Sequence, residues 1–153
     1  LGVGLLQKAA PLNVPPADAA KWREEAVGTF KQIVADCDKA EQRSGKLTDR
    51  EAWLRLQAAL RVLQTYQQMK KPQELLYAAA PLLDRYKGTV EELIVLSLVY
   101  HAFKQANDPK EALKTRDRMK DVFDKLPPSM FSQPTGEYSR DYWLKVWFVP
   151  EPK

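Results

Sequence analysis

The chain has 153 residues, of which 44% are hydrophobic and 29% charged, a composition typical of one folded domain and not of a disordered chain. Its formal net charge is +4, and acidic residues alternate with basic ones along 110–125, so the charge does not favour a nucleic-acid partner. The only cysteine is Cys37, which excludes an intrachain disulfide and a cysteine metal cluster. No stretch approaches the ~20 apolar residues of a membrane-spanning helix, so we expect no transmembrane segment in this chain.

The N-terminal segment is rich in proline and is predicted to be an extended arm over 1–16. Asp18 is expected to cap a helix that runs from Ala19 to about Gln42. The apolar residues of this helix recur at helical spacing and predict one buried stripe: Trp22, Ala26, Phe30, Ile33, Val34 and Cys37. Because Cys37 lies on this stripe, we interpret it as a small buried hydrophobe and not as a reactive thiol.

The second predicted helix begins after Thr48, where Glu51 completes a capping-box pattern, and it ends near Met69. Its apolar stripe consists of Trp53, Leu56, Ala59, Leu60, Leu63 and Tyr66. A third helix is predicted to start at Pro72, since proline suits the first helical position. Pro81 interrupts this third helix, so we expect either a kink or a break there.

Thr89 is expected to cap a fourth helix from Val90 to about Ala106, and a fifth helix is predicted from Lys110 to about Lys125. The fourth helix is apolar on almost every side. A helix of this kind must be covered all round, so we expect it to lie centrally in the domain.

The predicted helices form a helical repeat domain over 17–126, with about five helices. Residues 127–153 are predicted to be a loop and an aromatic-rich C-terminal segment that packs on this domain. The aromatic residues of this tail cannot all stay exposed without risking association. We therefore expect the tail to fold back on the helices, with docking on a partner as the alternative. The spacing of its aromatic residues fits either a short helix or a strand-like arm. The tail aromatics are also candidates for a secondary interface: Tyr138, Tyr142, Trp143, Trp147 and Phe148.

A shift of 37 residues places the second and third predicted helices on the fourth and fifth. Pro72 then falls on Pro109. Identical or conservative pairs continue on both sides of the turn: Leu56 with Leu93, Val62 with Val99, Tyr66 with Phe103, Leu76 with Leu113, and Leu82 with Met119. Chance would not preserve both the turn proline and the apolar stripe, so the sequence predicts a duplicated helical hairpin over 56–126.

The segment 107–113, Asn-Asp-Pro-Lys-Glu-Ala-Leu, together with an aromatic residue before each turn (Tyr66, Phe103), resembles the turn and second-helix start of a tetratricopeptide repeat (TPR). The resemblance covers about half of the chain and implies an all-α fold. In it, antiparallel helical hairpins stack as a short TPR-like α–α superhelix, here with extended N- and C-terminal arms. The chain departs from the family in its period of 37 residues, against about 34. It also has Leu63 and Tyr100 where small residues are expected, and a more general α–α superhelix is the alternative.

In tetratricopeptide proteins the first helix of each hairpin lines the concave face. By this resemblance the partner-binding face consists of Gln57, Leu60, Gln64, Gln67, Gln68, Ile94, Ser97, His101, Lys104 and Gln105. Such an amide-rich face suits an extended peptide, whose backbone groups need hydrogen-bond partners, although an ordinary solvated helix face is the alternative. Gln64 and His101 stand where some family members have the asparagines of a carboxylate clamp, so binding of a chaperone tail is not expected.

The sequence contains no phosphate-binding glycine loop, nucleophile elbow, metalloprotease helix or paired-cysteine metal site. His101 is the only histidine, and nothing near it in the sequence completes a Ser-His-acid triad. We therefore expect no enzyme activity, metal, cofactor or small-molecule substrate. The leading hypothesis is a non-catalytic protein–protein interaction or scaffold module that binds a peptide or partner subunit. The alternatives are an accessory subunit of an exported or membrane-associated complex and a weak nucleic-acid binder.

The chain starts at Leu1 without a methionine, so we expect a processed product or a fragment of a larger or exported protein. Its apolar opening, 1–6, is too short for a signal h-region, though it could be the remainder of one. Cytoplasmic and periplasmic locations both stay open.

Overall fold

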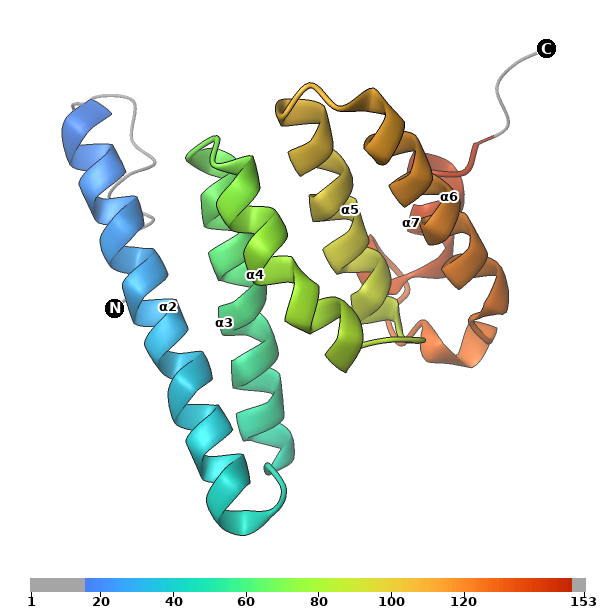
Figure 1. Cartoon of the computed structure of the whole chain (residues 1–153). Coiled ribbons are helices and arrows are strands. Elements are labelled where there is room, and N and C mark those ends of the chain that lie inside the picture. Colours follow the sequence, from blue (N-terminus) through green and yellow to red (C-terminus); the bar gives the residue numbers. More distant parts are fainter. Residues whose placement is uncertain (1–15, 150–153) are drawn as a thin grey trace. The chain divides into compact units, whose positions relative to one another are not determined.

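The computed structural model describes residues 16–149, and over these residues the chain is all-helical, as the sequence predicts (Figure 1). The α-helices are α2 (Pro16–Ser44), α3 (Asp49–Gln68), α4 (Pro72–Arg85), α5 (Val90–Gln105), α6 (Pro109–Lys125) and α7 (Arg140–Val146). Two short 3-10 helices, η1 (Pro128–Met130) and η2 (Gly136–Tyr138), connect α6 to α7. The predicted N-terminal arm, 1–16, lies outside the described residues, apart from Pro16, which starts α2. The predicted C-terminal arm is described as far as residue 149 and contains helices there.

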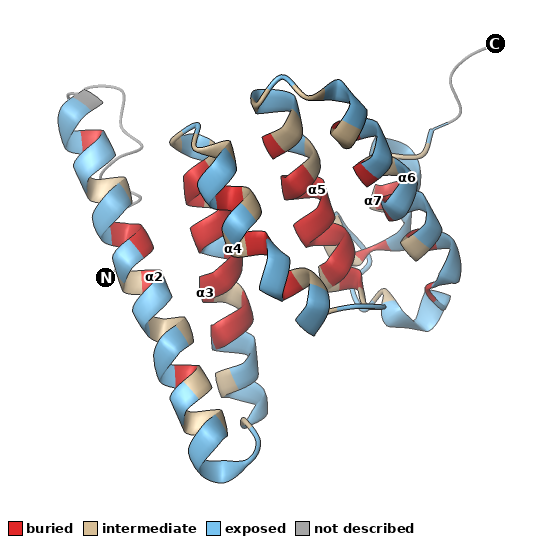
Figure 2. Cartoon of the chain, in the orientation of Figure 1, coloured by how far each residue is buried: buried red, intermediate tan, exposed pale blue. Residues whose placement is uncertain are grey.

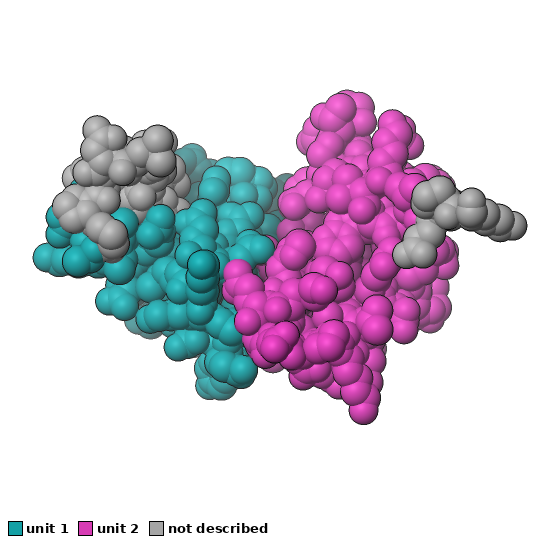
Figure 3. Space-filling view, turned by 90° about the horizontal axis from the view of Figure 1, so that it is seen from above, with its two compact units in different colours: residues 1–78 teal, residues 79–153 magenta. Residues whose placement is uncertain are grey.

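The chain divides into two compact units, 1–78 and 79–153, which Figure 3 shows in different colours. The boundary falls inside α4, between Ala78 and Ala79. Unit 1 contains α2, α3 and the first part of α4, whereas unit 2 contains the rest of α4, α5, α6 and the tail.

In unit 1, α2 and α3 pack along each other as a long hairpin (Figure 1). Gly45 ends α2 with a positive φ of 79°, which glycine adopts without strain. The predicted capping box is confirmed, since the Glu51 N–H donates to Thr48 Oγ1 (3.2 Å) and the Thr48 N–H donates to Glu51 Oε2 (2.9 Å). The core of this hairpin includes Phe30 and Leu63.

Two details of unit 1 differ from the sequence-based expectation. The first helix begins at Pro16, so Asp18 lies inside its first turn and not at the cap. Proline has no N–H to leave unsatisfied at the first helical position, which explains the earlier start. Trp53, placed on the buried stripe by its spacing, is 59% exposed, because it lies on the outward side of α3.

The helix α4 continues through Pro81 without a break. Proline removes one backbone hydrogen bond, the one that would reach the carbonyl of Tyr77. Pro81 is exposed. The predicted break is therefore absent, a kink at Pro81 stays a prediction, and the predicted start at Pro72 is confirmed.

In unit 2, α5 is buried from Val90 to Val99 except at Glu91, and Figure 2 shows most of this helix in red. Its last turns are more exposed. The unbroken buried run 92–99 contains Glu92 and Ser97 as its only polar members. This burial agrees with the prediction that the most apolar helix is covered. Thr89 stands at the N-cap, but its side chain does not cap α5: Thr89 Oγ1 donates to the Tyr86 carbonyl (2.6 Å) instead.

The tail ends the fold with a helix, α7, and not with a strand. Ser139 caps α7 by accepting from the Tyr142 N–H (3.2 Å). Trp143 is fully buried, and its Nε1–H donates to the Glu137 carbonyl (2.8 Å). In the loop before it, the Phe131 ring packs against Phe123 of α6 at 5.8 Å, while Met130 is exposed.

The turn between the helices of each predicted hairpin has the same backbone conformation in both copies. Lys70 (φ 54°) and Asn107 (φ 59°), which are 37 residues apart, are the non-glycine residues with positive φ in the described part of the chain. The hydrogen bonds of the two turns correspond pair by pair: Lys71 N to Tyr66 O with Asp108 N to Phe103 O (both 2.9 Å), Lys70 N to Gln67 O with Asn107 N to Lys104 O (both 3.1 Å), and Met69 N to Thr65 O with Ala106 N to Ala102 O (both 2.9 Å). The duplication seen in the sequence is therefore also present in the local structure.

These turns lead to a prediction about stability. Lys70→Gly should raise the free energy of unfolding by about 0.5–1 kcal/mol, because glycine adopts a positive φ without the penalty that a β-carbon brings. Asn107→Gly should raise the free energy of unfolding by less, since asparagine tolerates a positive φ better than lysine does. Lys39→Gly, at an exposed position inside α2, should instead lower the free energy of unfolding by a similar amount. Urea denaturation of the three variants measures all three changes, and equal effects at Lys70 and Lys39 would contradict the role of the turn.

Candidate functional site

The predicted partner-binding face has one half in each unit, so each half is described by itself. On α3, Gln68 is exposed, and Gln57, Gln64 and Gln67 are partly exposed. Leu60 is buried and does not belong to an accessible face, because it points into the core that α3 helps to form. The accessible part of this half is thus a row of amide side chains at helical spacing.

The row on α3 also contains two kinds of residue that the sequence analysis did not include. Arg61 is exposed and lies between Gln57 and Gln64 in the helical spacing. Trp53 and Leu54 continue the same row toward the start of the helix and are both exposed. Amides, one guanidinium and two apolar groups therefore share one accessible side of α3.

On α5 the predicted half is less accessible. Ile94 and Ser97 are buried, and Ser97 Oγ donates to the Ile94 carbonyl (2.7 Å), so neither can contact a partner while α5 stays covered. His101, Lys104 and Gln105, in the last turns of α5, are exposed. The expectation that both copies offer the same face is therefore wrong for Ile94 and Ser97.

The tail packs against the same end of α5. The Trp147 ring lies 5.2 Å from the Tyr100 ring and 5.5 Å from the His101 ring, measured between centroids. The Trp147 carbonyl accepts from Arg116 Nη2 of α6 (3.2 Å), and the Phe148 ring lies 5.0 Å from Phe123. The tail rings thus pack against the chain's own helices. The five aromatic residues predicted as a secondary interface are partly or fully buried by this packing.

This packing predicts the titration of the only histidine. Although His101 as a whole is exposed, its ring is partly desolvated where it lies beside Trp147 and Tyr100. This desolvation favours the neutral ring and lowers the pKa of His101 below its ordinary value of 6.5. The stabilisation that this contributes is present above pH 6.5 and is lost as the pH falls through the lowered pKa. NMR titration should give a pKa below 6.5 in the intact chain and a value closer to 6.5 in Trp147→Ala. An unchanged pKa in Trp147→Ala would contradict the packing of the tail on His101, and the exposed Trp53→Ala serves as the control.

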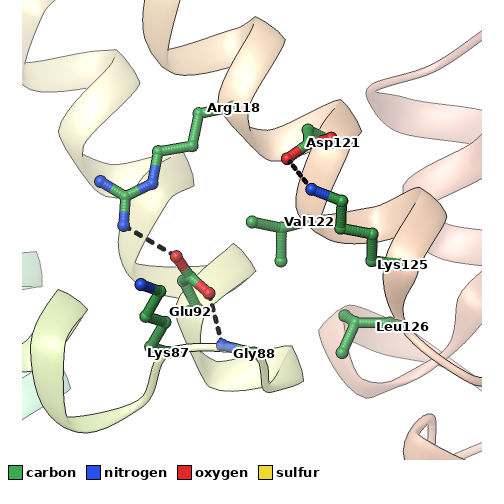
Figure 4. Close-up of a pocket in the computed structure, with 8 residues that line it drawn as sticks. All are labelled: Lys87, Gly88, Glu92, Arg118, Asp121, Val122, Lys125 and Leu126. Atoms are coloured by element: carbon green, nitrogen blue, oxygen red, sulfur yellow. Dashed lines mark hydrogen bonds and ion pairs between the residues drawn. The ribbon is translucent and has the colours of Figure 1, made fainter.

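A hollow of about 480 Å³ lies in unit 2, beside the start of α5 and the second half of α6 (Figure 4). Its size falls within the range of about 300–1,000 Å³ that is usual for ligand sites. The hollow is lined by Lys87, Gly88, Glu92, Arg118, Asp121, Val122, Lys125 and Leu126. Its lining is thus mainly charged, with an apolar part from Val122 and Leu126.

A buried carboxylate holds the two sides of this hollow together. Glu92 Oε1 accepts from Arg118 Nη2 of α6 (2.8 Å), and Glu92 Oε2 accepts from the Gly88 N–H (2.7 Å), as Figure 4 shows. The Glu92 side chain is 3% exposed, whereas that of Arg118 is 46% exposed. Both oxygens of the carboxylate are therefore engaged, and its charge also lies at the positive N-terminal end of α5.

This hollow is not among the surfaces that the sequence predicts. Thr89 and Glu92 have the spacing of a capping box, which was a usable signal for a structural role of Glu92. The sequence could not predict that Glu92 pairs with Arg118, because Arg118 is 26 residues away and lies in a helix with many other charged residues.

The single cysteine, Cys37, lies in the core of unit 1. Burial raises the pKa of the Cys37 thiol, although the Arg55 guanidinium acts in the opposite direction, so the thiolate is disfavoured.

Within residues 16–149, no group of three or more histidine, cysteine, aspartate or glutamate side chains is arranged to hold a metal ion. No described helix is long and apolar enough to cross a membrane.

Comparison of the chain with protein families, with curated proteins and with solved structures finds no match. The tetratricopeptide resemblance therefore rests on the residues quoted above and on the repeated turn.

Proposed function

We propose that this chain is a non-catalytic protein–protein interaction module that binds a peptide or a partner subunit through the accessible side of α3. The observation that carries the proposal is the row of Gln57, Arg61, Gln64 and Gln68, with Trp53 at its end, on a helix whose opposite side is buried. Glutamine side chains can donate to and accept from a peptide backbone, and arginine and tryptophan are common in the centres of interfaces. The likeness of the hairpin to tetratricopeptide repeats, in which the first helix binds partners, supports the same proposal.

An affinity capture with a matched control tests this function. The full chain is immobilised as wild type, as the triple variant Gln57→Ala, Gln64→Ala, Gln68→Ala, and as a control triple variant. The control changes three exposed glutamines elsewhere: Gln32→Ala, Gln42→Ala and Gln133→Ala. We expect a protein captured from the source cell lysate by the wild type and the control to be lost, by about tenfold or more, from the α3 variant.

Circular dichroism must first show the same helix content for all three proteins. Equal capture by the two triple variants would contradict the proposal, as would the absence of any saturable partner for the wild type.

A further inference from the structure

The hollow beside α5 and α6 offers hydrogen-bond donors, whereas the oxygens of its buried carboxylate are already engaged. Three of its side chains are cationic and two are anionic, which gives the lining a formal net charge of +1. Glu92 accepts from Arg118 and from the Gly88 N–H, so its charge offsets that of Arg118 and its oxygens do not compete for a ligand's donors. Asp121 offsets Lys125 in an exposed ion pair (2.8 Å), and Lys87 is the cation of the lining that no carboxylate of the lining offsets.

Two of these cations are available to a ligand. Lys87 is exposed and makes no ion pair with the residues that the structure describes. Arg118 uses one of its nitrogens on Glu92, and a guanidinium has five N–H donors in a fixed plane. Because the buried Glu92 carboxylate holds this plane in place, Arg118 would lose little conformational freedom when it binds an anion.

The hollow also has an apolar surface. Val122 is partly exposed and lies between the Glu92–Arg118 pair and the Asp121–Lys125 pair (Figure 4). Leu126 is largely buried and lines the hollow beyond Lys125, at the end of α6. An inorganic anion would use the cations but not these two side chains. A chain segment that carries an apolar side chain next to carboxylates would use both.

We propose that this hollow binds an acidic peptide segment of a partner protein, with an apolar side chain against Val122 and Leu126 and a carboxylate on Lys87 and Arg118. The proposal rests on the proposed function in that the ligand is a protein segment, but it names a second surface that shares no residue with α3. It also states the chemistry of that segment, which the α3 face does not define.

Binding of labelled peptides to the full chain tests the proposal. The probe is a fluorescein-labelled peptide of sequence Asp-Glu-Leu-Asp-Gly-Glu-Leu-Asp, followed by fluorescence anisotropy. Its counterparts have every acidic residue replaced by the amide, or both leucines replaced by alanine. We expect the probe to bind, each counterpart to bind at least about tenfold more weakly, which is about 1.4 kcal/mol, and binding to weaken as the salt concentration rises.

Variants of the rim locate the binding. Lys87→Glu should weaken binding of the probe by about tenfold. Asp121→Asn removes the exposed carboxylate of the rim and should tighten binding by about threefold, a gain that a misfolded protein cannot produce. Lys110→Glu, the same charge change at an exposed position of α6 away from the hollow, should leave binding unchanged.

Three outcomes would overturn the proposal. One is equal binding of the probe by the wild type and Lys87→Glu. Another is equal binding of the acidic and the amide peptides. The third is equal binding of the leucine and alanine peptides together with competition by inorganic phosphate, which would indicate a simple anion site. The triple variant of the α3 glutamines should bind the probe normally, so a failure here and a failure of the proposed function can be told apart.

Discussion

Trp143→Ala should lower the free energy of unfolding of unit 2 by about 3–5 kcal/mol, the usual range for the removal of a fully buried aromatic side chain. Trp143 is 0% exposed, its ring packs beside those of Tyr142 and Trp147, and its Nε1–H donates to the Glu137 carbonyl. The substitution therefore removes both the centre of the tail cluster and the hydrogen bond that joins α7 to η2. Urea denaturation followed by near-ultraviolet circular dichroism measures the loss.

Two further substitutions separate packing from hydrogen bonding. Trp143→Phe keeps most of the ring and should cost only about 1–2 kcal/mol, mainly for the lost hydrogen bond. Trp53→Ala makes the same change at a site that is 59% exposed and should alter stability by less than about 0.5 kcal/mol. If Trp143→Ala and Trp53→Ala had equal effects, the tail would not be docked on α5 and α6 in solution.

The helices themselves could be predicted from the sequence because each carries a clear local signal. The apolar spacing, the Thr48–Glu51 pair and the turn prolines Pro72 and Pro109 act over a few residues, and the structure confirms the helices, the capping box and both prolines as first helical residues. The boundaries were less predictable, since Pro16 and Asp18 are both good helix starters and only packing selects one. The all-α fold therefore followed from the sequence, and membership of the tetratricopeptide family stays a prediction.

The accessible surfaces were harder to predict, because accessibility depends on segments that are distant in the sequence. The helical spacing places Trp53 and Leu63 on the same predicted apolar stripe, yet Trp53 is exposed and Leu63 is fully buried. Ile94 corresponds to Gln57 in the repeat, but Ile94 is buried and Gln57 is partly exposed. Equivalent positions in the two copies therefore differ in solvent accessibility. The hollow at Glu92 depends on a contact with α6 that no periodicity reveals.

Glu92→Ala should lower the free energy of unfolding of unit 2 by about 2–4 kcal/mol. The carboxylate accepts one hydrogen bond from the Arg118 guanidinium and one from the Gly88 N–H, and hydrogen bonds to charged groups contribute about 1.5–3 kcal/mol each. Because the side chain is 3% exposed, water cannot easily take its place, and the Gly88 N–H is left without a partner. Glu91→Ala, one position earlier in the same turn, should change stability by less than about 0.5 kcal/mol.

A double-mutant cycle assigns this effect to the ion pair. Glu92→Gln keeps the side-chain volume, and Arg118→Met removes the charge and the donors with a small loss of volume, so these two variants and the double variant isolate the interaction between the two charges. We expect a coupling of about 1–2 kcal/mol, reduced from that of a fully buried pair because Arg118 is 46% exposed. A coupling below about 0.3 kcal/mol would mean that Glu92 acts on Gly88 alone. In that case Arg118 would not be held at the hollow, and its contribution to peptide binding would have to be explained without preorganisation.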